Sequence, residues 1–401
     1  MKYRKYTQNL RTLPNIIPKN LLLFPVFLGI LIGIVTILTF RSSKSNTPIE
    51  ANTSSIEIDK IADLYKIYQF EQTIDLKLSE MTIEEKISQL FMVSVSGSSM
   101  NENVKKIVEN YHIGGIVIMS ANIASKQELI KFITDIQNLA DTPLFIATDQ
   151  EGKGVNRIPW DASYDISQPH IGIVNREDFA YETGKTHANA LKDIKLNINL
   201  APVLDIAFEE DSIMAGRSLG SDPEKVANLG KEIIRAHQDI GILATAKHFP
   251  GIGRTTIDSH QKLPVIDISK EQLLEEELIP FRISISQKVD IIMTGHVLYP
   301  QIDPDYPASL SKIITSDLLR DELGFEGIII TDDIRMKALS NYPNKAVESI
   351  NAGTDMILVV DSFENQVNYI DEIRKAFEND TISGERIEES VRRVLRVKYT
   401  L

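Results

Sequence analysis

The sequence of 401 residues contains no cysteine, which excludes disulfide bonds, thiolate metal ligands and a cysteine nucleophile. It also lacks acidic residues throughout positions 1–44, where seven of the 43 Lys and Arg residues stand. Positions 45–401 therefore hold the other 36 basic residues and all 56 acidic ones, a net charge of −20. A segment this acidic argues against the basic footprint that phosphate groups need, so we do not expect nucleic acid as a partner.

Residues 21–40, LLLFPVFLGILIGIVTILTF, contain no charged side chain. A helix of this length spans the hydrocarbon core of a bilayer, about 30 Å. Basic residues precede the run, which predicts a cytoplasmic segment at 1–20 and a single-pass anchor in a bacterial cell membrane, with the remaining domain extracellular. A cleavable signal peptide is the alternative, but no A-x-A pattern follows the run. Residues 41–80 read as a linker and helical spacer.

Eight apolar runs rich in β-branched residues follow, and such runs are typical of strands buried on both faces of a parallel sheet. Amphipathic segments separate them, and one of these has Gly241 where its helix should end. The alternation predicts a TIM-type (β/α)8 barrel over residues 81–401, with a doubly wound open sheet as the alternative. The runs are residues 89–95, 114–120, 144–149, 196–205, 242–249, 291–297, 327–333 and 355–360.

Polar side chains gather at the carboxyl ends of these runs, which in a barrel form the active-site face. They are Asp149, Asp205, Lys247, His248, His296 and Asp332. The last of them belongs to a pair, Asp332 and Asp333, whose side chains must point to opposite faces of a strand. Asp332 can face the barrel mouth as a nucleophile for a glycosyl carbon, while a helix N-cap is the alternative for the pair.

The segment KHFPGIGRTTIDSH (247–260) contains a second group of reactive side chains. Asp258 can accept a hydrogen bond from one imidazole nitrogen of His260, which fixes the tautomer and leaves the other nitrogen to transfer a proton. A metal site formed by His248, Asp258 and His260 is the alternative. Lys247 beside them disfavours a cation, so we expect no metal and no cofactor.

Together these motifs resemble glycoside hydrolase family 3, in its β-N-acetylhexosaminidase branch. The resemblance covers about residues 80–400. It appears as MTIEEKISQLFMV (81–93), ATDQEG (147–152), NLAPVLDI (199–206), GRSLGSDP (216–223), the 247–260 segment, MTGHVLYPQID (293–303), LGFEGIIITDDIRM (323–336) and INAGTDMILV (350–359).

The resemblance implies a TIM barrel and a retaining, double-displacement mechanism. Asp332 matches the family nucleophile, His260 the acid/base of this branch, and Asp258 its partner. The sugar-binding positions carry over as Asp149, Arg157, Arg217, Lys247 and His248. We expect the three cations among them to keep Asp332 ionised, and the loop that carries His260 to close over the substrate.

Departures from the family pattern concern the outer subsites. Lys153 and Gly154 replace a glycine and an arginine, Ile252 stands where many relatives have histidine, and Arg335 replaces a small residue. The predicted reaction is hydrolysis of terminal β-linked N-acetylglucosamine from cell-wall or chitin-type glycans. Alternatives are a phosphorylase or transglycosylase at the same site, and a glycan-binding protein without turnover.

Overall fold

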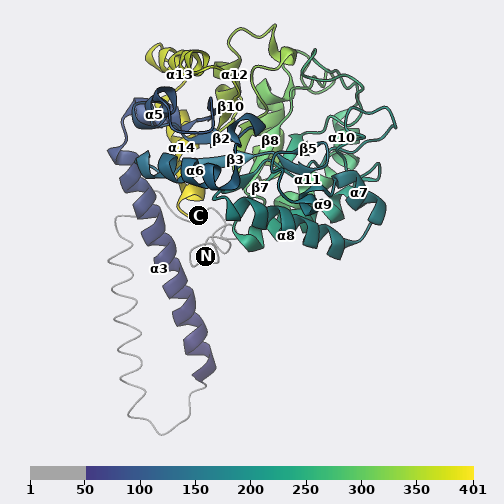
Figure 1. Ribbon diagram of the computed structural model, residues 1–401, viewed down its shortest axis with the longest axis horizontal. Helices are drawn as coiled ribbons and strands as arrows, with labels where there is room; N and C mark the ends of the chain where they lie inside the picture. The colour runs from purple at the N-terminus through teal and green to yellow at the C-terminus, as the bar shows by residue number, and fades with distance from the viewer. Residues whose placement is uncertain (1–50) are drawn as a thin grey trace. The chain divides into compact units, whose positions relative to one another are not determined.

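The computed structural model describes the backbone of residues 51–401 and the side chains from residue 62 on (Figure 1). The predicted cytoplasmic segment at 1–20 and membrane span at 21–40 lie outside the described residues. In the part that is described, no helix is long and apolar enough to cross a membrane. The chain divides into two compact units, Met1–Thr73 and Ile74–Leu401. Helix α3 (Ala51–Glu80) begins in the first unit and ends in the second.

The second unit contains eight parallel strands, and each lies within one of the eight predicted runs. They are β1 (Phe91–Ser94), β2 (Gly115–Val117), β3 (Phe145–Thr148), β6 (Ile198–Asn199), β7 (Leu243–Phe249), β8 (Ile291–Thr294), β9 (Ile328–Thr331) and β10 (Ile357–Val359). Their order in the sheet is β10-β1-β2-β3-β6-β7-β8-β9.

The two ends of this sheet meet. Ile330 and Met356 form a parallel bridge, and the backbone N–H of Thr331 donates to the carbonyl of Met356 at 3.0 Å. This contact joins β9 to the residue before β10 and closes the ring of strands. The fold therefore fits the predicted TIM-type barrel and not the open, doubly wound alternative.

Helices follow the strands and surround them (Figure 1). They are α4 (Ile83–Gln89), α5 (Glu102–Glu109), α6 (Lys126–Leu139), α7 (Gln168–Val174), α8 (Glu177–Asp193), α9 (Pro223–Ile240), α10 (Lys270–Glu275), α11 (Ile279–Ser286), η5 (Ile313–Glu322), α12 (Lys345–Asn351), α13 (Phe363–Glu378) and α14 (Gly384–Lys398). Helix α9 ends as predicted, because Gly241 adopts a left-handed φ of 91° that terminates it. A short antiparallel hairpin, β4 (Gln150–Gly152) and β5 (Val155–Asn156), follows β3.

On β7, β8 and β9, alternate residues belong to two different apolar clusters. On β9, Ile328 and Ile330 belong to a cluster that draws residues from all eight strands, which is the barrel interior. Ile329 packs instead with residues of the surrounding helices, among them Phe281. Because side chains alternate along a strand, Asp332 continues the inward series at the carboxyl end of β9.

Candidate active site

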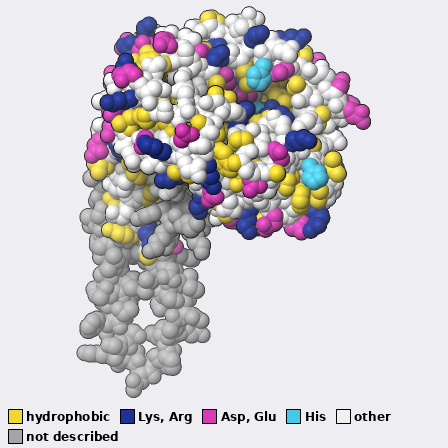
Figure 2. Space-filling view, in the orientation of Figure 1, with side chains coloured by type: hydrophobic (Ala, Val, Ile, Leu, Met, Phe, Trp, Pro, Cys, Tyr) yellow, Lys and Arg dark blue, Asp and Glu magenta, His cyan; other side chains and the backbone are white. Residues whose placement is uncertain are grey.

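The carboxyl ends of β3, β7 and β9 bring polar side chains to one rim of the barrel. Asp149 follows β3, Lys247 lies in β7 and Asp332 follows β9. Lys247 Nζ donates to Asp149 Oδ1 at 2.8 Å, although 98 residues separate the two. Figure 2 shows charged and histidine side chains gathered around a hollow on one face of the molecule. The closed ring therefore assembles distant residues into one site, as a barrel rim does.

Asp332 is held by its backbone and faces an imidazole. Its N–H donates to the carbonyl of Thr294 at 3.0 Å, and its Oδ1 accepts from the N–H of Asp333 at 2.8 Å. Oδ2 lies 3.9 Å from Nε2 of His248, and the side chain is 15% exposed. Burial alone would raise the pKa of Asp332, but His248 and then His296 outweigh it and lower that pKa. Asp332 is therefore a carboxylate at neutral pH.

His248 is oriented by a buried carboxylate. Oδ2 of Asp205 accepts from Nδ1 of His248 at 2.6 Å and from its backbone N–H at 3.1 Å. Oδ1 of Asp205 accepts from the N–H of Ile252 at 2.7 Å. Nδ1 therefore carries a proton, and Nε2 faces Asp332. Sequence reasoning placed Asp205 at a strand end and gave it no role. Its partner His248 lies 43 residues further along the chain, and only the fold brings the two into hydrogen-bonding contact.

Glu151 was not predicted from the sequence, yet it joins two of the predicted sugar ligands. Its carboxylate accepts from Nε and Nη2 of Arg217 at 2.9 and 2.7 Å, and it lies 2.7 Å from Nζ of Lys247. The side chain is 4% exposed. Burial alone would raise the pKa of Glu151, but Lys247 and Arg217 together lower it to about 2. The three side chains form one buried ionic network.

The predicted role of the three cations needs correction. Lys247 does lower the pKa of Asp332, but its effect ranks after those of the imidazoles of His248 and His296. The two arginines lie against other carboxylates: Arg217 is paired with Glu151, and Nη2 of Arg157 lies 3.7 Å from Asp149 Oδ2. Nε of Arg157 is buried and has no hydrogen-bond partner among the residues the structure describes.

The replacement Glu151→Gln should destabilise the protein at neutral pH. It leaves Arg217 and Lys247 buried without their carboxylate. Because the folded pKa of about 2 lies below the ordinary 4.5, the wild-type charge contributes about 3 kcal/mol of stability above pH 4.5. This contribution is lost as the pH falls from 4.5 towards 2. Urea unfolding should therefore show a larger difference in the free energy of unfolding between the two proteins at pH 7 than at pH 3, where about half of the contribution remains. The exposed Glu210→Gln is the control, and an equal loss in both variants would contradict the role of burial.

Asp258 and His260 form the predicted pair. Asp258 Oδ1 accepts from Nδ1 of His260 at 2.7 Å and from its backbone N–H at 2.8 Å. Burial alone would raise the pKa of Asp258, but these two hydrogen bonds lower it. The His260 side chain is 67% exposed, so Nε2, which Asp258 does not bind, is open to solvent. The pair thus presents an oriented imidazole with one nitrogen able to transfer a proton.

The loop that carries this pair is attached at both ends. Ser212 Oγ donates to the carbonyl of Gly253 at 2.7 Å, and the N–H of Ile213 donates to the carbonyl of Thr255 at 2.9 Å. On the other side, the N–H of Ala338 donates to the carbonyl of Ser259 at 3.0 Å. These bonds attach the loop on one side to residues 212–213 and on the other to the segment that follows Asp332.

Asp333 and His296 form hydrogen bonds with backbone groups around the site. Asp333 Oδ1 accepts from the N–H of Val360 at 3.1 Å and from that of Arg335 at 3.2 Å. His296 Nε2 donates to the carbonyl of Asp333 at 3.0 Å, and burial lowers the pKa of His296. His296 was placed at a strand end from the sequence without a role.

A metal site is not formed by the three residues of the alternative hypothesis. His248 binds Asp205, whereas His260 binds Asp258. Among the side chains described, those of residues 62–401, no group of three or more His, Asp or Glu is arranged to hold a metal ion.

Comparison with known proteins agrees with this geometry. The sequence matches the family described as "Glycosyl hydrolase family 3 N terminal domain" over residues 82–397. An "Uncharacterized secreted glycosyl hydrolase" of Arthroderma benhamiae is 35% identical over 78% of this chain and 92% of that protein. A "Beta-hexosaminidase" of Tolumonas auensis is 33% identical over 70% of this chain and 85% of that protein.

A solved structure extends the likeness to three dimensions. It is a glycoside hydrolase family 3 β-N-acetylglucosaminidase from Paenibacillus sp. str. FPU-7, which superposes with a TM-score of 0.78 at 37% identity. The match covers 80% of this chain but only 62% of the Paenibacillus chain. The family match spans most of the sequence and coincides with the barrel and its rim, so the chain belongs to glycoside hydrolase family 3 and is a glycoside hydrolase.

Proposed function

We propose that the protein is a retaining β-N-acetylhexosaminidase that hydrolyses terminal β-linked N-acetylglucosamine, with Asp332 as nucleophile and His260 as acid/base. The observation that carries the proposal is the ionised Asp332, which lies at the same rim as Lys247 and Asp149 and 3.9 Å from His248. The names of the Tolumonas and Paenibacillus relatives support the N-acetyl sugar.

In the first step, a carboxylate oxygen of Asp332 attacks the anomeric carbon and the bond to the leaving oxygen breaks. Nε2 of His260 gives its proton to that oxygen, and Asp258 stabilises the imidazole while it is protonated. The products of this step are the free alcohol and a glycosyl ester of Asp332.

In the second step, neutral His260 takes a proton from water, and the resulting nucleophile attacks the same anomeric carbon. The ester bond to Asp332 breaks, the carboxylate is restored and the sugar leaves with its original β configuration. A histidine replaces one of the two carboxylates that this chemistry ordinarily uses, so proton transfer depends on the Asp258–His260 hydrogen bond.

Five side chains would hold the sugar. Asp149 accepts from sugar hydroxyls, while Arg157, Lys247 and His248 donate to oxygens. The buried Nε of Arg157 supports this role because it has no hydrogen-bond partner within the described part of the chain. Arg217 binds Glu151 through Nε and Nη2, which leaves Nη1 for a hydroxyl or acetamido oxygen.

We further propose that the substrate is a cell-wall or chitin-type glycan, met outside the cell by a domain anchored through residues 21–40. The uncharged run and its basic flanks support an anchor. The description of the Arthroderma relative as secreted is in keeping with an extracellular site of action.

A substrate panel with the full-length chain tests the proposal. We expect release of the aryl group from an aryl N-acetyl-β-glucosaminide, with the aryl β-glucoside slower by at least about ten-fold. The rate should not depend on added phosphate, and the product should be the free sugar. Formation of sugar-1-phosphate would identify a phosphorylase. Binding of the glycan by a correctly folded protein without turnover would contradict enzymatic activity.

A further inference from the structure

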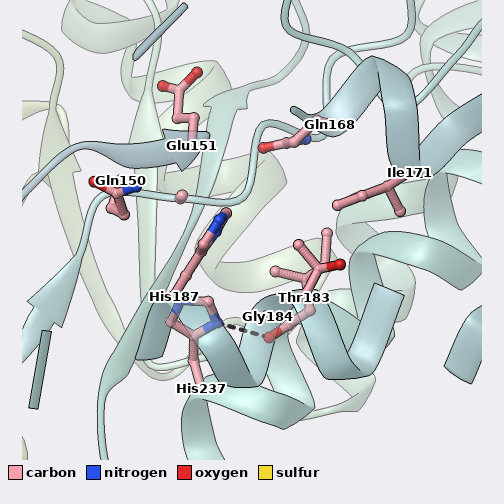
Figure 3. Close-up of a pocket in the computed structure, with 10 residues that line it drawn as sticks. Gln150, Glu151, Gln168, Ile171, Thr183, Gly184, His187 and His237 are labelled. Carbon is pink, nitrogen blue, oxygen red and sulfur yellow. Dashed lines mark hydrogen bonds between the residues drawn. The ribbon is translucent and has the colours of Figure 1, made fainter. Parts of the chain in front are cut away.

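Behind the sugar-binding rim lies a cavity of about 10 Å³, room for one water molecule. It is enclosed by β4, α7, α8 and α9, and two buried histidines line it, His187 and His237 (Figure 3). Neither histidine takes part in the proposed chemistry. Both are neutral at neutral pH, because burial lowers each pKa to about 4. A buried neutral imidazole can orient a neighbouring polar group through one fixed tautomer.

The tautomer of His237 follows from its hydrogen bonds. Nδ1 lies 2.8 Å from the carbonyl of Ile233, which can only accept, so Nδ1 carries the proton. Nε2 is then an acceptor, and it lies 2.9 Å from Nδ2 of Asn199. The imidazole therefore selects the orientation in which the Asn199 amide nitrogen points towards it. The flipped amide would place an oxygen against the lone pair of Nε2.

In this orientation the Asn199 amide forms hydrogen bonds with both backbone groups of Gln150. Oδ1 of Asn199 accepts from the N–H of Gln150 at 3.0 Å, and Nδ2 donates to the carbonyl of Gln150 at 3.0 Å. Asn199 is completely buried, so no water can replace these two bonds. A flip of the amide would place like groups against each other at both positions.

Gln150 in turn holds three residues of the sugar site. Its neighbours along the chain are Asp149 and Glu151, which bind Lys247. Its side-chain Oε1 accepts from the backbone N–H of Arg157 at 3.2 Å. A shift of the Gln150 peptide would therefore displace both carboxylates that position Lys247 and the guanidinium of Arg157.

We propose that His237 is a positioning residue for the sugar-binding end of the active site, acting through Asn199 on the Gln150 backbone. The inference rests on the proposed function in that Asp149, Arg157 and Lys247 are taken to hold the sugar. His187 lines the same cavity but forms no hydrogen bond to Asn199 or Gln150 among the described residues, and its Nε2 has no hydrogen-bond partner there. It therefore offers a matched control.

Steady-state kinetics of the full-length chain on an aryl N-acetyl-β-glucosaminide test this proposal. His237→Leu should raise KM on the order of ten-fold or more and change kcat less, because ground-state sugar contacts are misplaced. His237→Gln should restore KM, since its amide oxygen can occupy the place of Nε2, whereas His237→Asn should not. His187→Leu, which removes the other imidazole that lines the cavity, should leave KM within about two-fold of wild type.

Two further measurements separate this inference from its alternatives. If His237 acts through Asn199, then His237→Leu combined with Asn199→Ala should raise KM no more than Asn199→Ala alone. The single tryptophan, Trp160, follows Ile158, whose N–H donates to Oε1 of Gln150 at 3.3 Å. Its emission should therefore shift in His237→Leu without any substrate and return in His237→Gln.

Equal KM changes in His237→Leu and His187→Leu, or additive effects with Asn199→Ala, would overturn the proposal. A wild-type chain inactive on every glycoside would instead refute the proposed function, while the Trp160 measurement would still test the positioning. If His237→Leu fails to fold, the contrast between His237→Gln and His237→Asn decides, because only the amide of Gln reaches the position of Nε2.

Discussion

Asp332→Asn should lower kcat on the aryl N-acetyl-β-glucosaminide on the order of 10⁴-fold or more. The amide has nearly the same shape but cannot form the glycosyl ester, so the first step loses its nucleophile. KM should change little, because Asp149, Arg157 and Lys247 remain in place. Stopped assays at an enzyme concentration far above the one used for the wild type would measure the residual rate.

Asp333→Asn is the matched control for this prediction. It makes the same chemical change one residue away, at a side chain that accepts from the backbone N–H groups of Val360 and Arg335. We expect its kcat to stay within about ten-fold of wild type. A slowly released fluorinated N-acetylglucosaminide should add the mass of one sugar to a peptide that contains Asp332. If Asp333→Asn were the inactive variant, or the label lay elsewhere, the assignment of the nucleophile would be wrong.

The barrel could be predicted from the sequence because strands buried on both faces appear in it as short, continuous apolar runs. The eight runs that became the strands of the barrel are short, apolar and β-branched, and helical segments separate them, so the number and order of these eight strands could be predicted, whereas the β4–β5 hairpin could not. Closure could not be predicted, since it depends on the contact between Ile330 and Met356 at the two ends of the sheet. The predicted runs were also longer than the strands they contain, because turn and loop residues at the rim are apolar as well.

The residues at strand ends could be predicted, whereas their partners could not. Asp332 was separated from Asp333 by simple strand alternation, and the Asp258–His260 pair by its spacing of two. Glu151 gave no comparable signal, because its partner Arg217 lies 66 residues further along the chain. His237 lies within a regular amphipathic helix, where a buried histidine looks like any other core position. Only the folded chain shows that Nδ2 of Asn199, 38 residues earlier, lies 2.9 Å from Nε2 of that ring.

His260→Ala should separate the two steps of the reaction. A glycan with an alcohol leaving group needs a proton in the first step, so its turnover should fall about 10²- to 10⁴-fold. A nitrophenyl leaving group needs almost no protonation, so Asp332 should still be glycosylated. The second step then lacks the base that activates water. Nitrophenol should therefore appear in a burst equal to the enzyme concentration, followed by a slow steady state.

Azide supplies the decisive test of His260, because it attacks the glycosyl ester without needing a base. Added azide should restore steady-state release of nitrophenol by His260→Ala and yield the β-glycosyl azide, while leaving the wild-type rate nearly unchanged. Gln261→Ala, an exposed neighbour on the same loop, should behave like wild type in every assay. Full turnover of both substrates by His260→Ala would assign the acid/base to another group. A first step that fails even with a nitrophenyl leaving group would show that the His260 imidazole is needed for binding and not for proton transfer. The His260 side chain, 67% exposed in this structure, would then belong to a loop that must close before any chemistry begins.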